Sequence, residues 1–416
     1  AMDDVTIIMA QALQGLGHLR VSDAISHGLP GGVTPLFLTS RDPVLSYSHK
    51  IVSTHVVFRA LHEWVQRGWP EDLFTRWYRW SLRKNTTGLE KHLVGLLEQE
   101  QRQSTTLLVV ATHFGLGHQF AALKERWEKT QGLRMVVVVV VTDDTPLHLW
   151  AVGGVDAVIV PSTKTKQALE AYHVRQHLPA TTYVVLPYMV SPRLTNVLSA
   201  PQSQQRRDQL SPSTNTRIHV SVPVSGAAVQ LTYLSHLIRS LHAGNDRFFL
   251  HIVSRDMPSA RSFLKEMASL PYVHVQRSTD DRQVVDLYER LYEQEVIALE
   301  ITKPSEQAFK ALIPPTALGG SILLFSDPVG KQERDNLQFL ERHHLIDPDP
   351  ARNPSRSRCL RLPDGAAVSA QYVLQCLARG VFAHMARFTG YDNHPELSSD
   401  GVAQFWQWVR NYLSKQ

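Results

Sequence analysis

Short apolar runs rich in β-branched residues alternate along the chain with longer amphipathic segments. This alternation predicts parallel sheets whose strands are joined by crossover helices. In the first half of the chain the runs are almost continuously apolar, as expected of strands that are covered on both faces. The predicted strands are 5–9, 34–38, 106–110, 135–141, 157–160 and 182–186 in the first half, and 217–222, 248–253, 273–276, 296–299 and 321–325 in the second.

The composition changes between these two sets of strands. From residue 192 to 216 the chain is rich in Ser, Gln, Pro and Arg and has almost no apolar periodicity, which predicts an interdomain linker over 201–216. A chain of 416 residues is also too long for one ordinary core. We therefore expect two α/β domains, residues 1–200 and 217–395, with a cleft between them.

A helical insertion over residues 57–101 interrupts the alternation. Trp77 and Trp80 are interleaved there with Arg79 and Arg83. One interpretation is that its helices pack an apolar face on the sheet. The other is a surface for an acceptor or a membrane, because indole rings and basic side chains both favour the lipid interface. Such interleaving also suits nucleic-acid stacking, but the sequence contains no recognisable nucleic-acid module.

Composition narrows the function classes only slightly. A formal charge of +5 and a pI near 9.1 favour an anionic partner without specifying it. The two cysteines, Cys359 and Cys376, form no zinc-type spacing, so we expect a reducing compartment and no structural metal. The apolar run 135–141 is far shorter than the roughly 20 residues that span a bilayer. With no charged and then apolar leader at its start, we expect a soluble, cytoplasmic protein.

The first candidate for chemistry is the loop that contains Gly15, Gly17 and His18, directly after the first predicted strand. Glycines let the backbone approach a ligand closely, and the helix that follows presents free N–H groups. The spacing is not that of a dinucleotide fold, because the third glycine is missing. His18 is a candidate general base, since an imidazole titrates near neutrality. The alternative is that His18 caps or packs.

A second candidate is the segment after the valine-rich strand, where ligands bind in open α/β sheets. Asp143, Asp144 and His148 lie there. They could form a helix cap and a salt-bridged surface, or they could orient a base at the same edge.

The second half of the chain has three further strand-loop-helix units with polar turns. Ser225 and Gly226 form a small-residue turn of the type that binds phosphate at a helix N-terminus. The polar residues of the other two turns are Lys303, Ser305, Glu306, Gly330, Gln332, Glu333 and Asn336.

Taken together and in this order, the motifs resemble the two-domain glycosyltransferases of the GT-B fold. The similar branch includes monogalactosyldiacylglycerol synthases, processive diacylglycerol glucosyltransferases and the N-acetylglucosaminyltransferase of peptidoglycan lipid synthesis. The residues that match the family's motifs in the first domain are Gly15, Gly17, His18, His113, Val141, Thr142, Asp143, His148, Trp150, Pro161 and Ser162. Those in the second domain are Ser225, Gly226, Thr302, Lys303, Pro304, Pro328, Gly330, Gln332, Glu333 and Asn336.

The resemblance implies two Rossmann-like domains that face each other across a cleft, and a final helix, 396–416, that packs back on the first domain. It implies a UDP-sugar donor, no cofactor, and a lipid-linked acceptor at the inner face of the membrane. His18, oriented through Asp143, would deprotonate the acceptor hydroxyl. The implied acceptor site contains Gly15, Gly17, His113, His148, Trp77 and Trp80, and the implied donor site contains Ser225, Gly226, Lys303, Ser305, Glu306, Gly330, Gln332, Glu333 and Asn336.

The implied reaction is a single inverting displacement. A diphosphate bound at a helix N-terminus is stabilised as it departs, so no divalent metal is required.

The chain departs from this family near the ribose site. After the Lys-Pro pair the family has two glycines and then an acidic residue that binds the ribose hydroxyls, whereas this chain has Ser305, Glu306 and Lys310. Glu306 is the candidate substitute, because an ammonium group cannot accept a hydrogen bond. One alternative therefore stays open, namely a non-catalytic relative that binds a nucleotide or a protein partner. An epimerase of nucleotide-sugars shares the fold, but its active site would not need the aromatic and basic helices of 57–101.

Overall fold

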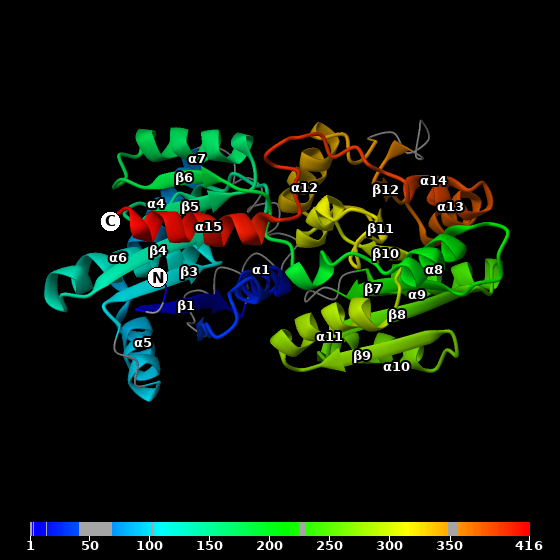
Figure 1. Ribbon diagram of the computed structural model, residues 1–416, viewed down its shortest axis with the longest axis horizontal. Coiled ribbons are helices and arrows are strands. Elements are labelled where there is room, and N and C mark those ends of the chain that lie inside the picture. Colours follow the sequence, from blue (N-terminus) through cyan, green and yellow to red (C-terminus); the bar gives the residue numbers. More distant parts are fainter. Residues whose placement is uncertain are drawn as a thin grey trace. The chain divides into compact units, whose positions relative to one another are not determined.

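The computed structural model describes residues 2, 4–13, 15–40, 69–100, 104–224, 230–347 and 356–416. The chain forms two compact units (Figure 1), one of residues 1–189 with 401–416 and the other of residues 190–400. Each unit contains a six-stranded sheet flanked by helices. All strand pairings within the two sheets are parallel, which confirms the predicted fold class.

The first sheet has the order β2-β1-β3-β4-β5-β6. Its central strands are buried along nearly their whole length, which explains why their sequences are continuously apolar rather than alternating. All six strands lie where the sequence predicted them: β1 (Val5–Ala12), β2 (Leu36–Ser40), β3 (Thr106–Ala111), β4 (Arg134–Val140), β5 (Ala157–Val160) and β6 (Thr182–Val185).

The first unit also contains the last helix of the chain. The Trp406 indole N–H donates to the carbonyl of Ile25 at 2.8 Å, and a Cβ on Gly28 would lie 2.2 Å from Val402 Cγ1. The last helix thus packs closely on the first, in the unit where the sequence analysis expected it. The helices of this unit are α1 (Leu16–His27), α4 (Trp69–Lys84), α5 (Thr87–Gln99), α6 (Phe114–Thr130), η1 (His148–Trp150), α7 (Thr163–Arg175) and α15 (Gly401–Ser414).

Helices α4 and α5 belong to the predicted helical insertion. The part of that insertion over residues 57–68 lies outside the described residues. Across the described parts of the chain, no helix is both long and apolar enough to cross a membrane.

The second sheet has the order β12-β11-β10-β7-β8-β9. The sequence analysis placed β10 three residues too early, because Glu300 interrupts the apolar pattern that it relied on. It missed β12 altogether, since three residues are too few to show a periodicity. The strands are β7 (Ile218–Val224), β8 (Phe248–Arg255), β9 (Val273–Ser278), β10 (Leu299–Thr302), β11 (Ile322–Phe325) and β12 (Cys359–Arg361).

The segment expected as a linker, 201–216, differs from that expectation, because much of it is helical. Helix α8 (Ala200–Leu210) begins with a capping box formed by Ser199 and Gln202. Its Arg206 side chain is buried and donates to the carbonyls of Pro315 and Ala317 at 2.9 and 2.7 Å. The polar residues of this segment therefore pair with backbone groups of the second unit, which an apolar periodicity cannot reveal.

The remaining helices of the second unit flank its sheet. They are η2 (Pro192–Leu194), α9 (Leu231–Gly244), η3 (Pro258–Ala260), α10 (Arg261–Ala268), α11 (Asp281–Gln294), η4 (Glu306–Leu312), α12 (Lys331–Arg342), α13 (Ala366–Ala378) and α14 (Val381–Met385).

A buried histidine makes the first unit sensitive to acid. His118 lies inside α6, and its Nε2 donates to the carbonyl of Leu149 at 2.8 Å. Burial lowers the pKa of His118 from 6.5 to about 3. In the unfolded chain the same group binds a proton as the pH falls below about 6.5, so unfolding takes up a proton and the folded state loses stability.

We therefore expect the free energy of unfolding of the first unit to fall by about 2 kcal/mol between pH 6.5 and 5 through this one group. All eight tryptophans of the chain precede residue 190 or follow residue 400, so urea unfolding followed by tryptophan fluorescence reports on this unit alone. The variant His118→Gln should lose this part of the pH dependence. Equal pH dependence in the two proteins would contradict the assignment.

Candidate functional site

The topology of the first sheet marks one place for a ligand. Along the chain, β1 is followed by its neighbour β2, and the chain then returns to β3 on the other side of β1. In open α/β sheets, ligands bind at such a switch point, outside the carboxyl ends of the two strands. The loop with His18 follows β1, and His113 follows β3. Both predicted residues therefore lie at the switch point.

His18 lies in the first turn of α1 and is held by backbone and side-chain groups of two neighbouring strand ends. Gly15 caps the helix with φ of 113°, a conformation that favours glycine. The His18 Nδ1 lies 2.8 Å from the carbonyl oxygen of Thr112 and 3.3 Å from the hydroxyl oxygen of Thr142. A carbonyl oxygen can only accept, so Nδ1 bears the hydrogen of the neutral ring and Nε2 bears the lone pair.

The structure brings His113 against His18. The two rings meet edge to face, with centroids 5.0 Å apart. His113 is buried, and its Nδ1 accepts the backbone N–H of Gly115 at 3.0 Å, which caps helix α6. His113 thus supports both the start of α6 and one side of the His18 ring.

The two adjacent aspartates have different environments. Asp144 is fully buried and accepts hydrogen bonds from the hydroxyls of Ser162 and Thr165 at the start of α7. It therefore supports a helix start from the core and does not lie on the salt-bridged surface that the sequence analysis gave as one alternative. Asp143 is partly exposed. Thr112 and Thr142 already orient the His18 ring, so the role of Asp143 beside His18 stays a prediction.

His148 contacts helix α4. Its Nδ1 lies 3.1 Å from Asp72 Oδ1, and its ring stacks on Tyr172 at a centroid distance of 4.0 Å. His148 therefore links η1 to the start of α4, and its predicted contact with an acceptor stays untested.

A row of aromatic rings connects the switch point to the surface of α4. We call it the aromatic row: His18, His113, Phe114, Tyr78, Phe74 and Trp77, with successive centroids 5.0, 4.4, 6.3, 5.8 and 6.3 Å apart. Tyr78 is buried, whereas Trp77 and Trp80 are each 57% exposed. One face of this helix therefore packs in the core, as the first interpretation expected. The other face presents tryptophans, and its contact with an acceptor or a membrane stays a prediction.

The second sheet has its own switch point, between β7 and β10. The turn after β7 contains Ser225 and Gly226, which lie outside the described residues. Lys303 follows β10 directly, and Ser305 and Glu306 begin the next turn and η4. The motif residues Lys303, Ser305 and Glu306 thus border the edge where a ligand is expected.

Asn336 joins two of the predicted donor segments. It lies on α12, is fully buried, and its Nδ2 donates to the carbonyls of Pro304 and Ser305 at 3.3 and 3.2 Å. Asn336 therefore positions the turn that contains Lys303, Ser305 and Glu306 rather than presenting its own amide at the surface.

The start of α12 is open to a ligand. Gly330 caps the helix, and a Cβ on it would meet no described atom within 4 Å. Glu333 Oε2 accepts the backbone N–H of Val329 at 2.5 Å, so Glu333 acts as a cap. Gln332 is exposed and remains the side chain of this turn that is placed to contact a ligand.

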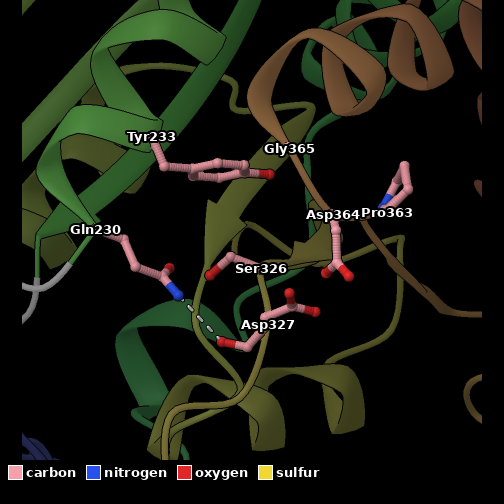
Figure 2. Close-up of a pocket in the computed structure, with 7 residues that line it drawn as sticks. All are labelled: Gln230, Tyr233, Ser326, Asp327, Pro363, Asp364 and Gly365. Atoms are coloured by element: carbon pink, nitrogen blue, oxygen red, sulfur yellow. Dashed lines mark hydrogen bonds between the residues drawn. The ribbon is translucent and has the colours of Figure 1, made fainter.

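A small pocket of about 100 Å³ lies at the ends of β11 and β12 (Figure 2). The carboxyl group of Asp364 faces that of Asp327 there, and their hydrogen bond, together with burial, raises the pKa of Asp327. The sequence analysis missed Asp364 because it follows the unrecognised strand β12. It did not single out Asp327, although this residue follows the predicted strand at 321–325. The residues that line the pocket are Gln230, Tyr233, Ser326, Asp327, Pro363, Asp364 and Gly365.

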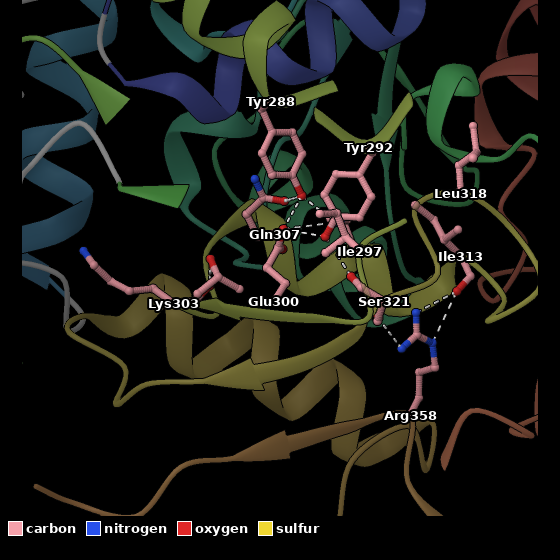
Figure 3. A network of polar contacts seen from close by, with 12 residues as sticks. Tyr288, Tyr292, Ile297, Glu300, Lys303, Gln307, Ile313, Leu318, Ser321 and Arg358 are labelled. Carbon is pink, nitrogen blue, oxygen red and sulfur yellow. Dashed lines mark hydrogen bonds and ion pairs between the residues drawn. The ribbon is translucent and has the colours of Figure 1, made fainter. Parts of the chain in front are cut away.

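Lys310 does not face the donor edge. Its side chain is buried and its Nζ lies 3.2 Å from Glu300 Oε1, within hydrogen-bond reach of the Tyr288 hydroxyl and 3.9 Å from the ring centroid of Tyr292. In Figure 3 the hydroxyl groups of Tyr288 and Tyr292 point toward Glu300, whereas the Lys303 side chain points away from them. In the sequence, Lys310 stands where the family has its ribose-binding acidic residue. In the structure, the Lys310 side chain belongs to a buried polar network.

No protein-family model and no curated protein matches this sequence. Solved structures do match along most of the chain. The S. aureus MnaA–UDP complex matches at 9% identity, covers 98% of this chain and 97% of its own, and has a TM-score of 0.51. The UDP-GlcNAc 2-epimerase from Neisseria meningitidis, bound to UDP-GlcNAc, matches at 9% identity over 98% and 100%, with a TM-score of 0.50.

A UDP-glucosyltransferase from Polygonum tinctorium matches at 13% identity over 97% and 98%, with a TM-score of 0.44, too low to support an argument. At 9% identity the first two similarities establish the fold, which is the two-domain Rossmann-like GT-B fold.

The buried position of Lys310 generates a stability prediction. Glu300 is fully buried, and its Oε2 has no hydrogen-bond partner among the residues that the structure describes. Lys310→Met leaves this carboxylate without its counter-charge, so we expect a loss of about 3–5 kcal/mol in the second unit. Urea unfolding followed by far-ultraviolet circular dichroism measures the loss, while tryptophan fluorescence follows the first unit separately.

The matched control is Lys331→Met, because Lys331 is exposed and its Nζ lies 4.0 Å from Asp335. This change should alter stability by less than about 0.5 kcal/mol. Adding Glu300→Gln to Lys310→Met should restore part of the loss, since no buried charge then remains. A loss no larger than that of the control would show that the pair contributes nothing.

Proposed function

We propose that the chain is a glycosyltransferase that moves a sugar from a nucleotide diphosphate donor, a UDP-sugar, to a hydroxyl acceptor. The observation that supports this most is His18 at the switch point of the first sheet, with its Nδ1 hydrogen directed at Thr112. That tautomer leaves the lone pair on Nε2, as a general base requires. The two-domain fold, shared with a protein crystallised with UDP and another with UDP-GlcNAc, is compatible with such a donor.

In the proposed reaction His18 Nε2 takes the proton of the acceptor hydroxyl. The acceptor oxygen forms a bond to the anomeric carbon as the bond from that carbon to the diphosphate oxygen breaks, so the configuration inverts. The leaving nucleotide diphosphate keeps the electron pair of the broken bond. The free N–H groups at the start of α12, beside Gly330 and Gln332, and the ammonium of Lys303 offer charge stabilisation for it, so we propose no requirement for a metal in this step.

The pocket at Asp327 and Asp364 suits the hydroxyl groups of the donor. Carboxylate oxygens accept hydrogen bonds from ribose or sugar hydroxyls, whereas they repel a diphosphate. We therefore propose that this pocket replaces the ribose carboxylate that the chain lacks at position 310, with Ser305 and Glu306 at the neighbouring turn.

The acceptor in this proposal is lipid-linked, and the protein binds the membrane surface peripherally at its cytoplasmic face. The support is the aromatic row, which leads from His18 to the exposed Trp77. Beside it Trp80 is also exposed, and the ammonium of Lys84 lies 4.8 Å from its ring centroid. Indole and ammonium groups side by side favour an interface with anionic lipid headgroups.

A second candidate is a UDP-sugar epimerase. It is favoured by one observation, namely that a UDP-GlcNAc 2-epimerase has the same fold at a TM-score of 0.50. An epimerase converts its nucleotide-sugar without an acceptor, and this difference separates the two proposals. A non-catalytic relative would bind the nucleotide-sugar and convert nothing.

Incubation with a panel of UDP-sugars, with and without detergent-dispersed diacylglycerol, tests the proposal by chromatography of products. We expect UDP release that depends on the acceptor. His18→Ala and His18→Gln should slow it about 10²- to 10⁴-fold, because neither side chain can take the proton. Both variants should still bind UDP in a thermal-shift assay, since donor binding is assigned to the second unit.

The matched control is His92→Ala, an exposed histidine on α5, which should leave the rate unchanged. A new UDP-sugar epimer formed without acceptor would replace the transferase proposal by the epimerase. A Tm rise with UDP-sugar but no product would favour the non-catalytic relative. An unchanged rate of UDP release in His18→Ala would show that His18 is not the general base.

Membrane binding is tested by co-sedimentation with liposomes that contain anionic phospholipid. Replacing Trp77 and Trp80 by Ala should weaken binding roughly tenfold per tryptophan, because each indole loses its burial at the interface. The control Val174→Ala changes another exposed apolar residue, on α7, and should sediment as the wild type does. If the double tryptophan variant sediments with liposomes as the wild type does, the proposed membrane-binding surface is wrong.

A further inference from the structure

Three side chains that commonly bind metals gather at the end of helix α12. His343 caps the C-terminus of this helix, and His394 and Glu396 lie between α14 and α15. One potential ligand atom from each residue lies within 4.8 Å of the other two. The cluster lies outside the donor segment, because α12 separates His343 from Gln332 by eleven residues, or about 16 Å along the helix axis.

The cluster is largely preformed. His343 Nε2 lies 2.6 Å from Glu396 Oε2, and both side chains are mostly buried. His394 and Glu396 belong to one turn, since the Glu396 N–H donates to His394 Nδ1 at 3.2 Å and the Leu397 N–H donates to the His394 carbonyl at 3.0 Å. The rings of His343 and His394 contact each other, with centroids 4.7 Å apart.

We propose that this cluster binds one divalent transition metal ion of the Zn²⁺ class. Two imidazoles and one carboxylate suit Zn²⁺, whereas Mg²⁺ and Ca²⁺ prefer oxygen ligands alone. Tetrahedral coordination at about 2.0–2.1 Å places ligand atoms about 3.3 Å apart. His343 and Glu396 are already closer than that, and the exposed His394 ring has room to approach them.

Metal binding displaces a proton from the cluster. In the metal-free protein the contact between His343 and Glu396 is a hydrogen bond or an ion pair, so His343 Nε2 bears a hydrogen. The metal replaces this proton, and it also takes the lone pair of one ring nitrogen of His394. A water molecule completes the fourth position. Affinity should therefore decrease as the pH falls, because the proton competes with the metal.

The proposed ion has a structural role and does not depend on the proposed glycosyl transfer. It would attach the segment that precedes α15 to the C-terminal end of α12. A simple ion pair would require only His343 and Glu396. It would not explain why His394 lies beside them. The sequence analysis expected no structural metal because the three residues are far apart in the chain and none is a cysteine.

The experiment uses the full chain, stripped with a chelator that is then removed. Zinc is titrated into the protein by calorimetry, and retained zinc is counted by elemental analysis after gel filtration. We expect one equivalent to bind and the Tm to rise with zinc concentration, as mass action requires. His394→Ala should weaken binding at least tenfold and lose the Tm rise. Because His394 is exposed, this variant should fold as the wild type does.

His236→Ala is the matched control, since His236 is an exposed histidine of the same unit, and it should bind zinc as the wild type does. Substitution with Co²⁺ should give the visible absorption of a tetrahedral complex in the wild type and the control, but not in His394→Ala. The proposal is overturned if the wild type retains no zinc, or if His394→Ala binds zinc as tightly as the wild type. Neither result would bear on UDP-sugar turnover.

Discussion

The parallel direction of every strand is the constraint on which both candidate sites depend. In a parallel sheet the carboxyl ends of all strands lie at one edge, so every loop that follows a strand emerges there. This is why Thr112 and Thr142, which are distant from His18 in the sequence, meet at its ring. The order of the strands then selects one position on that edge, because the chain leaves β1 and β3 in opposite directions. The same reasoning selects the ends of β7 and β10 in the second unit.

Buried polar side chains hold the loops at and behind the edge of the second sheet. Arg358 is fully buried and donates to the carbonyls of Ile313 and Ser321 (Figure 3). Arg206 does the same from α8 for the carbonyls of Pro315 and Ala317. Each guanidinium satisfies several carbonyls that no strand pairs with, which an apolar side chain could not do. Together with Glu300, these groups position the loops between β10 and β11.

The sequence predicted the parts of this structure that depend on local patterns. Short apolar runs identified eleven of the twelve described strands, one of them three residues too early, and glycine followed by histidine identified the turn at His18. It could not identify β12, which is three residues long, or helix α8, whose pattern is polar because Arg206 binds backbone carbonyls. It also could not show that Lys310 turns inward, since that depends on Glu300 from a neighbouring strand and Tyr288 from α11. Whether a polar side chain faces a ligand or is buried in the core depends on contacts with residues that are distant in the sequence.

The aromatic row bears on the choice between the two enzymatic proposals. An epimerase acts on a water-soluble nucleotide-sugar, and its chemistry gives no reason to place exposed indoles on α4. Burying Trp77 and Trp80 would have been favourable by about 1.5–3 kcal/mol each, yet each remains 57% exposed. The helix is nevertheless anchored, because Tyr78 and Leu82 are buried and Asp72 binds His148. Ring contacts join the exposed Trp77 to His18, and the exposed Trp80 lies on the same anchored helix. These tryptophans suit an acceptor with an apolar part, and they favour the proposed transferase.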